Sequence, residues 1–189
     1  MESARSASGD AWTALAKLLT ILVLAYASYL VITSLHVKQF LESSLPLELP
    51  FKSIAVFGGV MYILWIRLAR DLCGSGYGIA TALLIASLCL ATSPWFGVTN
   101  PWWFSVYGIA SFLAAAILIE KNLGFASNAC FCLINWAAAW IHGVSPVSAV
   151  GLGVGIGIAL ASGWAGDLAG IAVARALLRI DAVKALYRR

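Results

Sequence analysis

Charged residues are scarce in this 189-residue sequence. Only 11% of its residues are charged, whereas 62% are hydrophobic and the mean hydropathy is +0.93. Soluble domains carry about a quarter charged residues, so this composition excludes an ordinary soluble fold. No charged residue occurs between Asp71 and Glu120, and none between Lys121 and Asp167, so each interval can hold two membrane spans of about 20 residues. We therefore expect an all-α, polytopic membrane protein.

The apolar runs also lack the strict polar–apolar alternation of a membrane β-barrel, which favours helices. The first run lacks an AxA-type cleavage site at its end, so we expect it to be retained. Clusters of Gly, Pro, Ser and Asn separate six predicted spans in one compact bundle. The spans cover roughly Trp12 to Leu35, Phe51 to Arg70, Tyr77 to Ser93, Trp102 to Ile119, Phe125 to Ile141 and Val147 to Leu168. Residues 1–189 then form a single domain. Residues 169–189 are expected as a basic cytoplasmic tail, which can continue the last helix out of the bilayer and then lie along the membrane surface as an amphipathic segment.

The distribution of cations predicts the orientation of these spans. Ten of the twelve Lys and Arg residues fall on one side of the predicted topology, and only Lys38 and Lys52 fall on the other. Because cytoplasmic segments carry the excess of Lys and Arg, both termini are expected in the cytoplasm, with the chain in the cytoplasmic membrane.

Residue combinations that carry out catalysis are missing as well. Only His36 and His142 could supply imidazoles, which leaves little for a haem or zinc site. Ser75 and His142 are predicted at opposite ends of their spans, too far apart for a catalytic dyad. Cys130 and Cys132 point about 200° apart on a helix, and GLGVGIG lacks the Lys and Ser or Thr of a phosphate-binding loop. We expect no enzyme activity, no cofactor, no metal and no nucleic-acid partner.

What the sequence does have is an aromatic connection, SPWFGVTNPWW at residues 93–103. Large rings left in water forgo roughly 1.5–3 kcal/mol each of burial, so something must cover them. The predicted topology brings this connection and the end of the fifth span to the outer face. The candidate ligand-binding residues there are Trp95, Asn100, Trp102, Trp103, Tyr107, Asn135, Trp136 and His142.

Each of these residues also has a structural interpretation. Trp and Tyr gather at headgroup depth in membrane proteins generally, so the rings could form an interfacial belt. An amide within a span, such as Asn135, needs a partner, which can be another helix or a ligand. His142 could bind a ligand or cap the carbonyls at its helix end.

Small residues recur every four positions in two of the spans. Such faces allow close helix packing, either within the bundle or against a partner protein. The faces are Gly151, Gly155, Ala159 and Gly163; Gly153, Gly157, Ala161 and Ala165; and Gly78, Ala82 and Ala86.

The order of LELPFKSIAVFGG, RLARDLCGSGYGIATALL, SPWFG, NPWWFSVYGIASFLAAAILIEK and GWAGDLAGIAVARALLRI resembles the substrate-binding S-component of energy-coupling factor (ECF) transporters. The resemblance implies six helices with both ends cytoplasmic and a vitamin or similar micronutrient bound near the outer face. It also implies a transmembrane coupling subunit and ATPase subunits as partners. The chain departs from the family at the first helix, where Ala16, Thr20 and Leu24 form only a weak version of the small-residue docking face.

The function expected from these observations is capture of a small neutral or aromatic micronutrient for ATP-driven uptake. The chain itself should bind without pumping, because it lacks both an ATPase motif and a buried relay of acidic residues. The alternatives are a structural or assembly subunit of a membrane complex and, third, a lipid-modifying membrane enzyme. A sealed outer pocket would favour the binding protein, and an open apolar groove would favour the assembly subunit.

Overall fold

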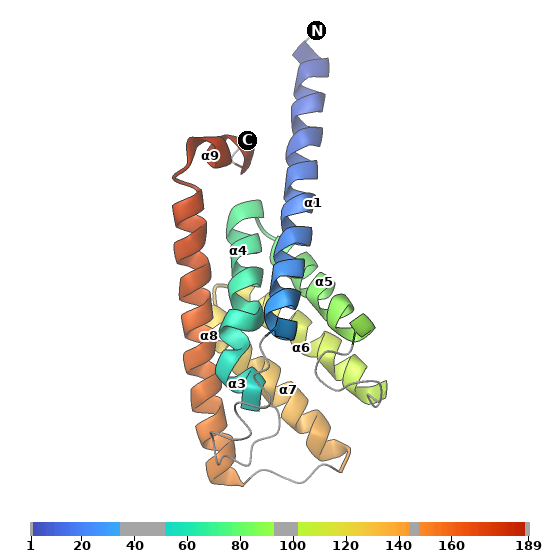
Figure 1. Cartoon of the computed structure of the whole chain (residues 1–189), viewed down its shortest axis with the longest axis vertical. Coiled ribbons are helices and arrows are strands. Elements are labelled where there is room, and N and C mark those ends of the chain that lie inside the picture. The colour runs from blue at the N-terminus through green and yellow to red at the C-terminus, as the bar shows by residue number, and fades with distance from the viewer. Residues whose placement is uncertain (1, 35–51, 93–101, 144–147, 188–189) are drawn as a thin grey trace.

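A computed structural model of the chain describes residues 2–34, 52–92, 102–143 and 148–187, apart from the side chains of residues 2–10, 102 and 104. The described residues form helices joined by turns, without a β-strand (Figure 1). Four helical stretches are long and apolar enough to cross a membrane: Ala11–Ser34, Lys52–Cys73, Gly124–Ile141 and Ala149–Leu177. Two further apolar helices, Tyr77–Thr92 and Ser105–Glu120, are shorter. The expected all-helical class is confirmed, and these lengths and compositions indicate a membrane protein.

The first and second apolar runs differ in regularity. Helix α1 (Glu2–Ser34) is continuous, whereas the second run consists of α3 (Lys52–Gly58), a π-helical turn η1 (Gly59–Ile63) and α4 (Leu64–Cys73). A π turn interrupts the regular ladder of backbone hydrogen bonds and often marks a functional site. A side chain from another helix accepts a hydrogen bond from this π-helical turn: the Gly59 N–H donates to Ser162 Oγ at 3.0 Å.

Asn128 of another helix also hydrogen-bonds to the second apolar run, in α3 and in η1. This residue is fully buried at the start of α7 (Ser127–Ile141). Its Nδ2 donates to the carbonyls of Ile54 at 3.2 Å, Ala55 at 3.1 Å and Ala159 at 3.3 Å, and its Oδ1 accepts from the Tyr62 hydroxyl. Because hydrocarbon offers no water to replace these partners, one amide holds three segments of the chain together.

Three aromatic rings form the centre of the apolar core. α5 (Tyr77–Thr92), α6 (Trp102–Glu120) and the short 3₁₀ turn η2 (Gly124–Ala126) lead into α7. The Tyr62 ring lies 5.3 Å from Phe112 of α6 and 4.7 Å from Phe131 of α7, and those two rings are 4.9 Å apart. All three side chains are less than 2% exposed, so they join η1, α6 and α7 through one packed contact.

The last helix is longer than predicted. α8 (Ala149–Leu177) begins at Ser148, whose side chain accepts a hydrogen bond from the Gly151 N–H at 3.1 Å. Its 29 residues correspond to about 43 Å, more than the roughly 30 Å of a bilayer core. The helix therefore continues beyond the predicted last span, as expected for a tail that extends it out of the bilayer.

Beyond α8, the chain turns into the short helix α9 (Asp181–Tyr187). α9 lies across the end of the bundle at which α1 begins (Figure 1). The Tyr187 hydroxyl hydrogen-bonds with Thr20 of α1 there. Below, this end is called the terminal end, and the end where α8 begins is called the aromatic end.

Most of the small-residue faces are used within the bundle. Gly155, Ala159 and Gly163 of α8 are buried, and so are Gly78, Ala82 and Ala86 of α5. The structure therefore confirms intramolecular packing for these two faces. The third face stays exposed on α8, at Gly153, Gly157, Ala161 and Ala165.

Candidate functional site

Three of the predicted site residues meet where α6 begins and α7 ends. Trp103 lies in the first turn of α6, and His142 directly follows α7. Their rings stack in parallel, with centroids 4.4 Å apart and an angle of 4° between the planes. The Tyr107 ring stands edge-on to both, 6.3 Å from Trp103 and 5.9 Å from His142. Trp103, Tyr107 and His142 are called the aromatic cluster below.

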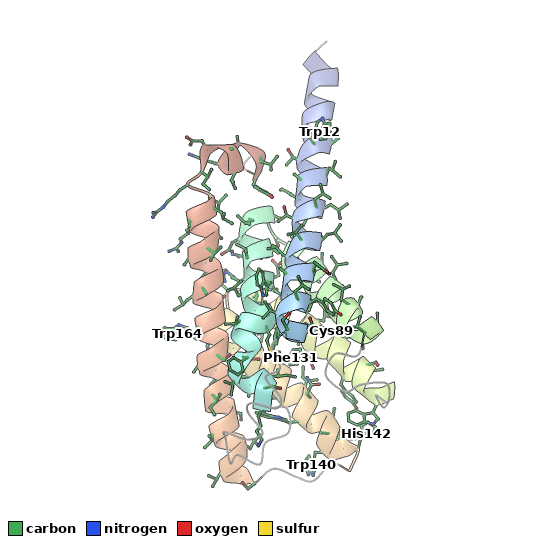
Figure 2. The ribbon with its side chains drawn as sticks, in the orientation of Figure 1. Trp12, Cys89, Phe131, Trp140, His142 and Trp164 are labelled. Atoms are coloured by element: carbon green, nitrogen blue, oxygen red, sulfur yellow. The ribbon has the colours of Figure 1, made fainter. Side chains whose placement is uncertain are left out.

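Backbone hydrogen bonds at the end of α7 satisfy two carbonyls that a histidine side chain could otherwise cap. The backbone N–H of His142 donates to the Ala138 carbonyl at 3.0 Å, so the main chain satisfies that carbonyl. Gly143 follows at φ +80°, a left-handed conformation that glycine adopts without steric cost, and its N–H donates to the Trp140 carbonyl at 3.2 Å. The helix therefore ends at the histidine, whose exposed side chain lies at the aromatic end (Figure 2).

A polar contact between α6 and α7 lies beneath the aromatic cluster. Asn135 is 2% exposed, and its Nδ2 donates to Ser111 Oγ and to the Phe131 carbonyl, both at 2.8 Å. Ser111 in turn donates to the Tyr107 carbonyl at 2.6 Å. The amide nitrogen of Asn135 therefore makes the interhelical contact of the structural interpretation, and this contact fixes the helix turn that carries Tyr107.

The remaining predicted site residues are placed differently. Trp136 is buried in the apolar core one residue after Asn135. Trp95 and Asn100 lie outside the described residues. Trp102 begins α6, but its side chain also lies outside the description.

A charged cluster that was not predicted from the sequence lies inside the bundle, nearer the terminal end. Arg67 of α4 donates through Nε to Asp71 Oδ2 at 2.9 Å and through Nη1 to Asp167 Oδ1 of α8 at 3.2 Å. Arg70 Nη1 also lies 2.7 Å from Asp71 Oδ1. Arg67 is 7% exposed and Asp167 is 8% exposed, so this ion pair is buried. The sequence contained one indication of this cluster. Asp167 lies within the last apolar run, and a carboxylate buried there needs a cation as its partner.

The expected absence of a serine–histidine dyad agrees with the placement of both residues. Ser75 lies in the turn between α4 and α5, where its hydroxyl donates to Glu120 at 3.2 Å, whereas His142 is at the far end of α7. Among the described residues, no three His, Cys, Asp or Glu side chains are grouped as metal ligands. All four cysteines are described, and all are free thiols.

No protein-family model matches the chain. No curated protein and no solved structure matches it either.

Proposed function

We propose that this chain is a six-span binding protein of the cytoplasmic membrane that captures a small neutral or aromatic micronutrient at its aromatic end. The observation that carries the proposal is the parallel stack of Trp103 on His142, flanked by Tyr107. The two rings already cover each other's facing sides, so a planar ligand would stack on an outward face of the pair or against the edge of Tyr107. The Asn135–Ser111–Tyr107 contact supports the proposal, because it holds the two ring-bearing helices in a fixed relation.

Delivery across the membrane would need partner subunits. The sequence contains no nucleotide-binding loop, and the resemblance to ECF S-components suggests a transmembrane coupling subunit with cytoplasmic ATPases. In the proposed orientation both termini are cytoplasmic, and the aromatic cluster faces outward. The exposed α8 face at Gly153, Gly157 and Ala161 is the small-residue surface still accessible to such a subunit.

The same exposed face also favours the second candidate function, that of an assembly subunit. A stripe of glycine and alanine lets another helix approach closely whether or not a nutrient is bound. In that case the aromatic cluster would contact lipid or protein, and no small molecule would accompany the purified chain.

The test is mass spectrometry of small molecules released from gently purified protein, followed by titration with the compound found. Trp103→Ala should weaken binding by roughly 5- to 150-fold, equivalent to about 1–3 kcal/mol, because one stacking surface is lost. Trp140→Ala is the matched control, since this ring is 69% exposed at the same end of α7. The binding function is rejected if no compound is recovered, or if Trp103→Ala binds it as tightly as Trp140→Ala does.

A further inference from the structure

The contact between α9 and α1 creates a surface that the proposed function does not use. Thr20 Oγ1 donates to the Ala16 carbonyl at 2.8 Å, so its oxygen is the acceptor for the Tyr187 hydroxyl. This bond fixes the last helix against the first at the terminal end (Figure 1). The position of α9, and of the charges that it carries, is therefore defined by tertiary structure.

An apolar groove begins at the same threonine. It is a shallow hollow of about 200 Å³, open to the surroundings, and its described lining residues all lie on α1: Leu19, Thr20, Val23 and Leu24. Leu19 and Val23 are exposed, and they belong to a stretch of α1 that is apolar enough to lie in a bilayer. A groove of this composition on a membrane helix suits a hydrocarbon chain.

Cations accompany the Thr20–Tyr187 contact on both helices. Lys184 is exposed and lies one helical turn before Tyr187, which places both residues on one face of α9. Lys17 lies one turn before Thr20 on α1, with its Nζ 5.5 Å from the centre of the Tyr77 ring. Arg175 and Arg179 are exposed where α8 leads into α9, and these cations outnumber the single carboxylate of α9, Asp181. Exposed Ile180 and Leu186 add the apolar surface typical of a segment at the membrane interface.

We propose that the terminal end binds an anionic phospholipid between α1 and α9. One acyl chain lies along the groove at Leu19, Val23 and Leu24, and the phosphate lies beside Lys184. The cytoplasmic leaflet carries the anionic lipids that match these charges, in the orientation expected from the distribution of Lys and Arg. The site is separate from the aromatic cluster, which lies at the other end of the bundle (Figure 2).

The experiment uses the full chain in nanodiscs that contain phosphatidylcholine and phosphatidylglycerol, followed by native mass spectrometry of the lipids that stay bound. The wild-type chain should retain phosphatidylglycerol in preference to phosphatidylcholine. Lys184→Gln should lower this preference about five-fold, the factor for one cation at a membrane surface. Lys121→Gln is the matched control, because it removes another exposed cation, which lies in the α6–α7 turn and not on α1 or α9.

A second variant tests the groove without changing charge. Val23→Trp places a large ring over the groove and should reduce the amount of bound phosphatidylglycerol, and a thermal unfolding scan identifies any variant that has lost its fold. Equal retention of both lipids by the wild-type chain would overturn the proposal. So would a Lys184→Gln preference equal to that of Lys121→Gln, or displacement of the lipid by inorganic phosphate alone.

Discussion

At the scale of single residues, Gly59 shows how closely two helices of this bundle approach. A Cβ atom at Gly59 would overlap the backbone carbonyl oxygen of Ser162 in α8, and one at Gly166 would overlap the backbone of Gly59. Backbone atoms cannot move aside as the end of a flexible side chain can. The two glycines are therefore required by the packing of η1 against α8, which also places the Gly59 N–H on Ser162 Oγ.

Gly59→Ala should destabilise the folded chain by about 1–3 kcal/mol, the usual cost of overpacking a core, or prevent folding. Gly157→Ala is the control, because a Cβ atom there would have no neighbour within 4 Å. Gly157 is exposed in the interior of α8, so Gly157→Ala should stabilise the folded chain by roughly 0.5–1 kcal/mol, because alanine has the higher helix propensity. Denaturant titration in mild detergent measures both, and equal stability of the two variants would contradict the close approach.

At the scale of elements, α4 and α8 are joined by charge as well as by packing. The Arg67–Asp167 contact is buried, so the free energy of the pair depends on both members being present. Removal of one partner leaves an uncompensated ion in a medium of low polarity, whereas removal of both leaves only apolar surface. Asp71 keeps Arg70 as a partner in either case.

Arg67→Met alone should therefore cost about 3–5 kcal/mol of stability, because Asp167 loses its cation. The double variant Arg67→Met with Asp167→Leu should be more stable than Arg67→Met alone. A double-mutant cycle measured by denaturant unfolding gives the coupling free energy between the two residues. Additive effects of the two changes would show that the ion pair does not join the helices.

Across the whole molecule, the described Lys and Arg residues are unevenly distributed between the two ends. The described Lys17, Arg70, Lys121 and Lys184 lie toward the terminal end, whereas Lys52 begins α3 near the aromatic end. α1 and α9 share the terminal end, and Trp140 and His142 lie at the other (Figure 2). Under the positive-inside rule, this asymmetry predicts that the terminal end is cytoplasmic.

Cysteine labelling in intact cells can test this orientation in a background in which the four native cysteines are replaced by alanine. Ala149→Cys, exposed at the start of α8, should react with a membrane-impermeant maleimide. Lys121→Cys, exposed in the α6–α7 turn, should react only after the cells are opened. The reverse pattern would place the aromatic cluster in the cytoplasm and remove the uptake function.

The sequence by itself determined the helical membrane class and most helix positions. These properties are local, since a long run of apolar residues without charge can satisfy its backbone in a bilayer only as a helix. The predicted third span, Tyr77 to Ser93, coincides with the observed α5, Tyr77–Thr92, over all of its described residues. The aromatic character of the α6 and α7 ends was likewise evident from their composition.

The tertiary structure alone decided which of these residues meet. Trp103 and His142 stack although far apart in the chain. Asn128 is the central buried amide because the α3 carbonyls of Ile54 and Ala55 accept from its Nδ2, and the Tyr62 hydroxyl of η1 donates to its Oδ1. The pairing of Asp167 on α8 with Arg67 on α4 likewise joins residues that are 100 positions apart in the chain. Pairing between distant segments depends on how the helices pack, and a one-dimensional pattern of charge and hydropathy does not contain that information.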